Sequence, residues 1–467
     1  MFRVSDLEGM LGVKPATPLR EGEVSNVSID SRTLQAGAVF VAISRERDGH
    51  DFVDEARRKG ASAFVLCESA WRSRRFDLGE NVFLVRDTTQ ALGAMARAWR
   101  KRHRVRAIAV TGSSGKSSTK EMANLLLSRC YRVLATEGNL NNQWGLPLTI
   151  FRLREEHQVL LVERGASRPG DIAYLASILE PELGAITNVY PAHLEGLGSL
   201  EGVYAAKLEL AGELSRSDGT LAISGDDALL AQKARELAVR VVTFGRHESH
   251  YRMTRSWMEN GGFGFEVNGR WRFRLECEAL FQTDNFLAAI ALAHEAGVPM
   301  EDLEGPLRSL VPLPGRFEIH QLADGVTAVY DGYNANPGSM LRGLEGFARR
   351  AEANGARAQR RIAVLADMKE LGPETREWHR AVGRELRAFA LDLLVTVGRD
   401  SREISEEARS RGAAGEIHHF ASNTEVAGFL RNVLAPGDWI FLKGARAMKM
   451  EEILSALKEI EAEAKPS

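Results

Sequence analysis

The sequence has few cysteines, no excess of basic charge and no long apolar segment, and each absence excludes a class of protein. Its 467 residues include only three cysteines, Cys67, Cys130 and Cys277, which lie far apart without CxxC spacing. This spacing argues against a disulfide framework and against a zinc–thiolate site. The formal net charge is −2 at pH 7, so the chain lacks the basic field that drives nucleic-acid binding.

The N-terminus and the hydropathy pattern argue against export and membrane insertion. The first residues, MFRVSDLEGMLGV, include acidic side chains and no long apolar core, and no apolar run in the chain is long enough to cross a bilayer. We therefore expect a cytoplasmic protein that neither binds nucleic acid nor inserts into a membrane, with a monomer as the default state.

The length and the pattern of apolar runs predict three α/β domains. Residues 1–103 contain short β-branched runs around a helix-like segment, which predicts a small mixed α/β domain that ends in a helix over Gln90–His103. Short buried-type strands then alternate with helices, which predicts a parallel sheet covered on both faces, a doubly wound domain, over residues 104–312, and the loop after the first of these strands makes this domain P-loop-type. The pattern restarts after the joint Val311–Arg316, so residues 313–467 are expected to form a Rossmann-like domain, although they lack a GxGxxG fingerprint.

The run TGSSGKSSTK, from Thr111 to Lys120, follows the apolar run Ala107–Val110 and resembles a shortened phosphate loop. A standard Walker loop would need glycine where this chain has Val110. A strand, a glycine-bearing turn and a helix direct backbone N–H groups toward one point, where a polyphosphate can bind. Lys116 would reach the terminal phosphates and Ser117 would bind Mg²⁺. The structural alternative is a turn that only links a strand to a helix.

Three further residues are candidates for handling metal and charge. Glu163 ends the strand-like run VLLVE and His193 follows the run GAITNV, so both are expected at the carboxyl edge of one sheet, where open α/β folds bind ligands. Lys207 lies on a predicted helix fourteen residues beyond His193. Each also has an ordinary reading, as a helix cap, a loop histidine and a surface lysine. A hard Mg²⁺ ion prefers oxygen ligands, which counts against the histidine and the lysine.

Several longer motifs resemble the Mur ligase family, and most closely its branch that joins D-alanyl-D-alanine to UDP-N-acetylmuramoyl-tripeptide. The resemblance covers nearly the whole chain. It rests on TGSSGKSSTKEM, GNLNNQWGLPLT, AHLEGLGSLEGVYAAKLEL, PLPGRFE, YDGYNANPGSM, LADMKELG and KGAR. The resemblance implies an ATP-dependent ligase of cytoplasmic peptidoglycan precursor synthesis, with two Mg²⁺ ions. In such a ligase the γ-phosphate passes to a substrate carboxylate, and the amine of the dipeptide then displaces it from the acyl phosphate.

The resemblance also implies roles for individual residues. Lys116, Glu163, His193 and Lys207 are implied to be catalytic, and Ser117, Glu163, His193 and Lys207 to form the metal site. Lys207 matches a lysine that several members carry as a carbamate, an anionic group that suits Mg²⁺. The implied nucleotide-binding residues are Thr111, Gly112, Ser113, Ser114, Gly115, Lys116, Ser117, Ser118, Asn285, Arg316 and Asp331. The implied substrate-binding residues are Ser31, Arg32, Asp48, His50, Asn142, Asn334 and Asn336.

Four residues depart from the family pattern, and two other functions stay open. Arg164 stands where leucine is usual, Asp284 where histidine commonly precedes Asn285, and Tyr330 and Gly332 where acidic and small polar residues are typical. The alternatives are a Mur-type or folylpolyglutamate-type ligase for another amino acid, and a nucleotide-binding regulatory subunit without catalysis. The third residue of the acceptor peptide, diaminopimelate or lysine, does not follow from the sequence.

Overall fold

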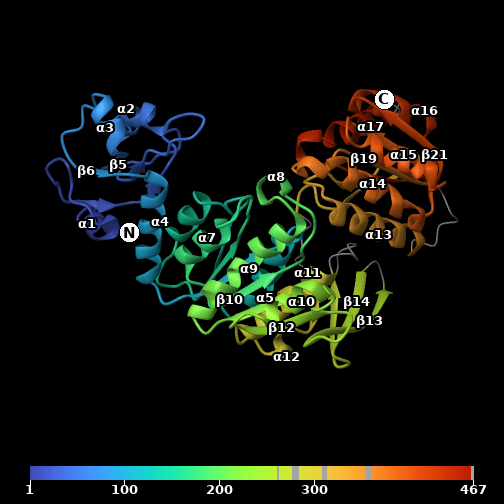
Figure 1. The fold of residues 1–467 in the computed structure, drawn as a ribbon, viewed down its shortest axis with the longest axis horizontal. Coiled ribbons are helices and arrows are strands. Elements are labelled where there is room, and N and C mark those ends of the chain that lie inside the picture. The colour runs from blue at the N-terminus through green and yellow to red at the C-terminus, as the bar shows by residue number, and fades with distance from the viewer. Residues whose placement is uncertain (260–261, 276–282, 308–312, 354–359, 464–467) are drawn as a thin grey trace.

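The computed structural model describes residues 1–259, 262–275, 283–307, 313–353 and 360–463. Three α/β lobes follow one another along the chain, and the first and third lie on opposite sides of the second (Figure 1). This arrangement confirms the predicted fold class. Within the described ranges, no helix is long and apolar enough to cross a membrane. The exact domain boundaries stay predictions, and Val311 and Pro312 of the expected joint lie outside the described residues.

The first lobe is built on a parallel four-stranded sheet in the order β3-β4-β5-β6. The strands of this lobe are β1 (Phe2–Arg3), β2 (Glu23–Val24), β3 (Val27–Ser28), β4 (Val39–Val41), β5 (Ala63–Cys67) and β6 (Val82–Val85), and β1 and β2 pair with each other in a separate two-stranded sheet. Its helices are α1 (Asp6–Leu11), η1 (Gly49–Phe52), α2 (Val53–Arg58) and α3 (Glu68–Ser73). The helix α4 (Thr88–Lys101) leads into the second lobe and begins two residues before the predicted Gln90, because the Asp87 carboxylate accepts hydrogen bonds from Thr89 N and Gln90 N.

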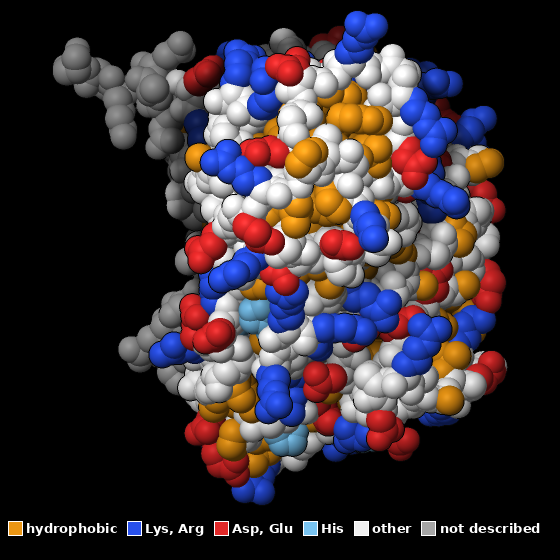
Figure 2. Space-filling model, turned by 90° about the vertical axis from the view of Figure 1, so that its left-hand side faces the viewer, with side chains coloured by type: hydrophobic (Ala, Val, Ile, Leu, Met, Phe, Trp, Pro, Cys, Tyr) orange, Lys and Arg blue, Asp and Glu red, His pale blue; other side chains and the backbone are white. Residues whose placement is uncertain are grey.

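The basic tail of α4 is paired with acidic groups. Arg102 contacts Asp6 at 2.9 Å and Lys101 contacts Glu180 at 3.1 Å, so the helix end is tied to both neighbouring lobes. Figure 2, which views the molecule from the end formed by the first lobe, shows basic side chains with acidic side chains lying among them. The tail therefore contributes to local ion pairs at the junction between the two lobes.

The second lobe contains a ten-stranded sheet in the order β16-β15-β14-β13-β12-β11-β10-β7-β9-β8. Its strands are β7 (Arg106–Thr111), β8 (Val133–Ala135), β9 (Val159–Glu163), β10 (Leu183–Ile186), β11 (Thr220–Ser224), β12 (Arg240–Gly245), β13 (Tyr251–Glu259), β14 (Gly262–Val267), β15 (Trp271–Leu275) and β16 (Gly305–Leu307). The strands from β8 to β13 are parallel, as the alternating pattern predicts, whereas β13, β14 and β15 form an antiparallel extension that we did not predict.

The helices of the second lobe cover both faces of its parallel strands. They are α5 (Lys116–Leu127), α6 (Gly145–Ile150), α7 (Asp171–Leu179), α8 (Leu194–Leu197), α9 (Leu200–Arg216), α10 (Ala228–Arg235), α11 (Thr283–Glu295) and α12 (Met300–Leu303). The connection after β7 runs toward β8, whereas the connection after β9 crosses back to β10. Right-handed crossovers in opposite directions place α5 and α7 on opposite faces. The carboxyl ends of β7 and β10 therefore form the switch point where such sheets bind ligands.

The third lobe has a six-stranded sheet in the order β17-β18-β22-β19-β20-β21, of which only β17 is antiparallel to its neighbour. Its strands are β17 (Glu318–Gln321), β18 (Thr327–Asp331), β19 (Arg361–Ala366), β20 (Leu391–Val397), β21 (Ala414–Phe420) and β22 (Trp439–Lys443). Its helices are η3 (Ala323–Gly325), α13 (Pro337–Ala353), η4 (Gly372–Glu374), α14 (Thr375–Glu385), η5 (Leu386–Phe389), α15 (Arg402–Ser410), α16 (Asn423–Val433), η6 (Arg446–Met448) and α17 (Glu451–Glu463).

Candidate active site

The loop between β7 and α5 requires glycine at two positions. Gly112 has φ 146° and Gly115 has φ 77°, both on the positive side that side chains disfavour. A Cβ atom at Gly112 would lie 2.0 Å from Thr187 Oγ1, and one at Gly115 would lie 2.1 Å from Asn285 Oδ1. The loop is therefore pressed against the end of β10 on one side and against α11 on the other.

The segment after β10 anchors the first half of this loop. Ser113 N donates to Asn188 O at 3.0 Å, and Ser114 N donates to Asn188 Oδ1 at 2.9 Å. Thr187 Oγ1 donates in turn to Ser114 O at 2.6 Å. These N–H groups are engaged by protein, so the groups positioned for an anion are those at the start of α5, from Lys116 onward.

Lys116 begins α5 and lies within the loop. Its Nζ donates to Gly112 O at 2.9 Å and contacts Ser113 O at 3.4 Å. Burial lowers the pKa of Lys116, while the nearby Glu163 carboxylate opposes that shift and Arg316 adds to it. Lys116, Glu163 and Arg316 therefore share one electrostatic environment.

Glu163 ends β9, directly beside β7, and its side chain is only 3% exposed. Asn141 Nδ2 donates to Glu163 Oε1 at 2.9 Å, whereas Oε2 is buried with no hydrogen-bond partner among the described residues. A buried carboxylate oxygen without a donor is costly unless a cation faces it. Glu163 therefore has the chemistry of a ligand for a hard cation.

His193 lies at the same edge of the sheet, immediately before α8. Its backbone is left-handed, with φ 55°. Its Nδ1 forms an ion-pair contact with Glu370 Oε2, which comes from the third lobe. The His193 imidazole lowers the pKa of the Glu370 carboxyl group. No group of three or more His, Cys, Asp or Glu side chains in the described parts of the chain has metal-binding geometry, so Glu163 and His193 would supply only part of a coordination shell.

Lys207 lies on α9 and is 1% exposed. Burial lowers the pKa of Lys207 to about 7, and the positive charge of Lys116 lowers it further. The surface-lysine reading is therefore wrong, because the side chain is a buried amine within electrostatic reach of the phosphate loop.

The third lobe contributes Arg316, Asp331 and Lys443 to the site. Arg316 Nη2 donates to Ser117 Oγ at 3.0 Å across the lobe junction, and its guanidinium lies 4.2 Å from the centre of the Tyr333 ring. Lys443 Nζ, at the end of β22, contacts Asp331 Oδ2 at 2.5 Å and Asn334 O at 3.1 Å. Lys443, which the sequence suggested as a substrate-facing residue, thus orients the predicted Asp331.

Most of these residues line one cavity of about 300 Å³ between the second and third lobes. Of the predicted residues, its lining includes Ser113, Ser114, Gly115, Lys116, Ser118, Glu163, His193, Asn285, Arg316, Asp331, Asn334 and Asn336. Thr111, Gly112, Ser117, Asn142 and Lys207 are not part of the lining.

The predicted substrate residue Asn142 points away from the cavity. Its Oδ1 accepts hydrogen bonds from Trp144 N and Gly145 N at the start of α6, whereas the side chain of its neighbour Asn141 donates to Glu163. The motif NLNNQ did not reveal which asparagine faces the site.

The predicted substrate residues Ser31 and Arg32 lie in the first lobe, away from this cavity. Ser31 Oγ donates to Glu55 Oε2 at 2.7 Å, and Arg32 forms an exposed ion pair with Asp30 at 2.7 Å. The first lobe also reaches the second through Arg45, whose guanidinium lies 3.5 Å from the centre of the Trp144 ring. That contact was not predicted.

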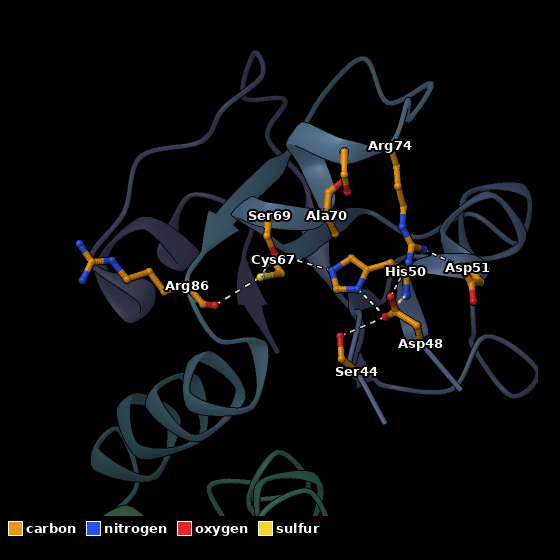
Figure 3. A network of polar contacts seen from close by, with 10 residues as sticks. Ser44, Asp48, His50, Asp51, Cys67, Ser69, Ala70, Arg74 and Arg86 are labelled. Atoms are coloured by element: carbon orange, nitrogen blue, oxygen red, sulfur yellow. Dashed lines mark hydrogen bonds and ion pairs between the residues drawn. The ribbon is translucent and has the colours of Figure 1, made fainter. Parts of the chain in front are cut away.

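His50 and Asp48 form the polar network of the first lobe shown in Figure 3. His50 is 3% exposed; its Nδ1 lies 2.7 Å from Asp48 Oδ1, and its Nε2 accepts from Cys67 N at 2.9 Å. Arg74 Nη2 also donates to Asp48 Oδ2 at 2.6 Å. Both ring nitrogens of His50 are therefore used within the lobe, which favours a positioning role for this residue.

Three of the four departures from the family pattern have structural partners. Asp284 lies between Arg246 Nε at 3.7 Å and Arg342 Nη2 at 3.5 Å, so a cross-lobe ion pair occupies the position beside Asn285. A Cβ atom on Gly332 would lie 2.5 Å from the Tyr330 ring. Gly332 therefore accommodates Tyr330, and these two departures explain each other.

The fourth departure, Arg164, predicts a stabilising substitution. Its side chain is 0% exposed, and its Nε and Nη2 have no hydrogen-bond partner among the described residues. Burial lowers the pKa of Arg164 to about 9. Arg164→Leu should raise the free energy of unfolding by about 1–4 kcal/mol, because it removes a buried, poorly paired charge. Urea unfolding at pH 7 would measure this, with Arg164→Gln expected to gain less; a lower midpoint for Arg164→Leu would contradict it.

Comparison with known proteins identifies relatives over the whole chain. Family models described as Mur ligase family, catalytic domain, Mur ligase middle domain, and Mur ligase, glutamate ligase domain match residues 23–100, 110–293 and 315–446. The UDP-N-acetylmuramoyl-tripeptide–D-alanyl-D-alanine ligase of Escherichia coli is 34% identical over 441 residues, 93% of each chain, and that of Bacillus subtilis is 32% identical with the same coverage.

Solved structures of similar proteins share the fold. The crystal structure of MurF from Acinetobacter baumannii superposes with a TM-score of 0.86 at 29% identity and covers 98% of each chain. The MurF ligase from Thermotoga maritima, solved in complex with ADP, superposes with a TM-score of 0.82 at 28% identity and covers 94% of this chain and 98% of its own.

Proposed function

The chain belongs to the Mur ligase family, and we propose that it is a MurF-type enzyme that joins D-alanyl-D-alanine to UDP-N-acetylmuramoyl-tripeptide at the expense of ATP. The observation that carries this proposal is the convergence of Lys116, Glu163, His193, Arg316 and Asp331 on one cavity between two lobes. The reaction belongs to cytoplasmic peptidoglycan precursor synthesis, and we take the enzyme to act as a monomer.

ATP fits the cavity with its phosphates at the start of α5. The N-terminus of this helix presents unpaired N–H groups and a positive dipole, and Lys116 and Arg316 add two cations. Asn285 lies against Gly115 and would face the base, and the Asp331 carboxylate, held by Lys443, would accept hydrogen bonds from ribose hydroxyl groups. The nucleotide would thus bind both lobes at once.

The cavity also fits Mg²⁺. Glu163 supplies a buried oxygen without a donor, His193 lies at the same edge, and Ser117 provides a hydroxyl group. A Mg²⁺ ion bound by few protein ligands takes its other ligands from phosphates and water. When bound, it would neutralise charge on the transferred phosphoryl group and on the tetrahedral species that follows.

Lys207 fits a carbamate. Carbon dioxide reacts with a neutral amine, and a pKa of about 7 leaves much of the Lys207 amine neutral at physiological pH. The resulting anion would reverse the charge of this buried position, which lies within electrostatic reach of Lys116. A carbamate at Lys207 would therefore support the cation site that Glu163 and His193 begin.

The residues of the cavity suit acyl transfer through an acyl phosphate. A carboxylate oxygen is a poor leaving group, and its phosphorylation needs positioning and charge neutralisation more than covalent chemistry by the protein. Lys116 and Arg316 would hold the γ-phosphate while the tripeptide carboxylate attacks it, the bond to the β-phosphate breaks and ADP leaves. The amine of D-alanyl-D-alanine then attacks the acyl carbon and phosphate leaves. The two lobes enclose this step, which keeps water from the acyl phosphate.

The acceptor nucleotide would extend from the first lobe toward the cavity. Ser31, Arg32, Asp48 and His50 belong to the lobe assigned to the UDP-sugar, and Asn142, Asn334 and Asn336 are assigned to the peptide end. The Arg45–Trp144 contact ties that lobe to the segment that carries Asn141. This extended path would separate recognition of the UDP group from the chemistry by the length of the peptide.

An assay of substrate pairs tests the proposal. With UDP-N-acetylmuramoyl-tripeptide and D-alanyl-D-alanine, the purified protein should release ADP and form the pentapeptide product, measured by coupled ADP detection and mass spectrometry. Acceptors with diaminopimelate or lysine at the third position would establish that preference. ADP release with a single amino acid but not with the dipeptide would assign another ligase of the family. Nucleotide binding without turnover of any pair would assign a regulatory subunit.

A further inference from the structure

The loop after β19 reaches from the third lobe to the candidate metal residue of the second. Glu370 lies on this loop, and its Oε2 contacts His193 Nδ1. The backbone meets as well, because Glu195 N donates to Glu370 O at 3.4 Å. The loop therefore meets the start of α8 through both a side chain and the main chain, and α8 also packs against η4.

Both residues of this contact have strained backbones. Glu370 has φ 64° and His193 has φ 55°, and neither is glycine. Left-handed conformations are costly for residues with side chains and persist where the surrounding structure imposes them, often at functional sites. Two such residues that touch each other across a lobe junction indicate that the contact itself is the feature being maintained.

The loop that carries Glu370 is held firmly within its own lobe. The Asp367 carboxylate, 2% exposed, accepts hydrogen bonds from backbone N–H groups of residues 399–401 and contacts Lys369 Nζ at 2.9 Å. His379 Nε2 accepts from Met368 N at 3.0 Å, and its Nδ1 lies 2.7 Å from Thr375 O. The position of Glu370 is thus determined by the third lobe as a whole rather than by a flexible loop.

The ion-pair contact with Glu370 bears on which nitrogen of His193 is available to the cavity. A carboxylate beside Nδ1 favours the tautomer with the proton on that nitrogen, which leaves the lone pair on Nε2. A carboxylate behind an imidazole commonly orients a metal-binding histidine in this way. We propose that Glu370 is a positioning residue that orients His193, so that the cation site is completed only when the third lobe is docked on the second. This inference rests on the proposed function and assigns a role to the LADMKELG motif.

Kinetics of Glu370 variants test this role. Glu370→Ala should raise the Mg²⁺ concentration for half-maximal activity by about 10–100-fold. The KM for the UDP-tripeptide should not change, because the UDP group is assigned to the first lobe. Glu370→Gln keeps an acceptor oxygen and should recover part of the loss. Glu195→Gln, an exposed carboxylate on the same helix as the contact, is the control and should behave as wild type.

A second measurement does not depend on turnover. In the metal-free full-length protein labelled with ¹⁵N-histidine, the His193 signals, assigned by their loss in His193→Gln, should report a protonated Nδ1 and an unprotonated Nε2. Glu370→Ala should shift this signal toward a mixture of tautomers, while the circular dichroism spectrum stays unchanged.

The two measurements separate this inference from the proposed function. An unchanged His193 tautomer, or an unchanged Mg²⁺ dependence in Glu370→Ala, would overturn the role of Glu370 even if the wild type is a D-alanyl-D-alanine ligase. A wild type without ligase activity would overturn the proposed function, and the tautomer measurement would still decide whether Glu370 orients His193.

Discussion

Lys207→Ala should lower kcat by about 10²–10³-fold, the size of effect seen when one charge-stabilising group is removed from an active site. The substitution removes the only amine on α9 that can form the proposed carbamate, and it leaves Glu163 and His193 without an anionic partner. A short-chain carboxylate such as acetate or propionate should restore part of the activity, because the vacated space would admit an anionic oxygen pair. Initial rates of ADP release at several acid concentrations measure both effects.

Two further variants separate a chemical role for Lys207 from a packing role. Lys207→Met keeps the apolar stem and should be as inactive as alanine, whereas Lys233→Ala, a partly exposed ion-paired residue on α10, should retain wild-type activity. Because burial lowers the pKa of Lys207 to about 7, the neutral amine becomes more abundant as the pH rises from 6 to 8. Carbamate content, measured by ¹³C NMR with labelled bicarbonate, should rise with it. Full activity of Lys207→Ala would remove the carbamate from the mechanism.

Lys116→Ala should abolish most phosphate transfer, with a loss in kcat of about 10²–10³-fold. The ammonium lies at the start of α5 beside Glu163 and Arg316, so its removal leaves the γ-phosphate without one of its two cations. Binding of the UDP-tripeptide should stay within about threefold of wild type, because the UDP group is assigned to the first lobe. Calorimetric titration with the UDP-tripeptide, beside ADP release, measures the two effects separately.

A matched control tests whether loss of charge alone explains the Lys116 result. Lys101→Ala removes a lysine from the end of α4, where it pairs with Glu180 at 3.1 Å, and should change neither binding nor turnover. Loss of UDP-tripeptide binding in Lys116→Ala would show that the lobes do not divide recognition and chemistry as proposed. Unchanged ADP release would remove Lys116 from phosphate transfer.

Local sequence signals predicted much of the fold because they depend on nearby residues. The run Ala107–Val110, which is completely buried, and the glycines at 112 and 115 predicted a strand followed by a phosphate loop. The antiparallel strands β13 to β15 were not predicted, although they extend the same sheet. Strand pairing depends on partners distant in sequence, so short alternating runs alone do not determine it.

The residues of the candidate site also divide into those that the sequence predicted and those that only the structure revealed. Its principal residues, Lys116, Glu163 and His193, could be named from the strand ends that carry them, because the carboxyl ends of parallel strands share one edge of a sheet. The pairing of Asp331 with Lys443 and the hydrogen bond from Asn141 to Glu163 could not be predicted. Such contacts depend on side-chain directions in loops, which have no fixed periodicity.

The sequence by itself determined the family, the order of the three α/β lobes and the positions of the phosphate loop and of the buried strands, because these follow from local motifs and hydropathy. Only the tertiary structure decided which asparagine faces Glu163, that Lys207 is a buried amine, and that Glu370 meets His193 across the lobes. Burial and contacts between distant segments arise when the lobes pack against each other, and they set the pKa and the orientation of each group.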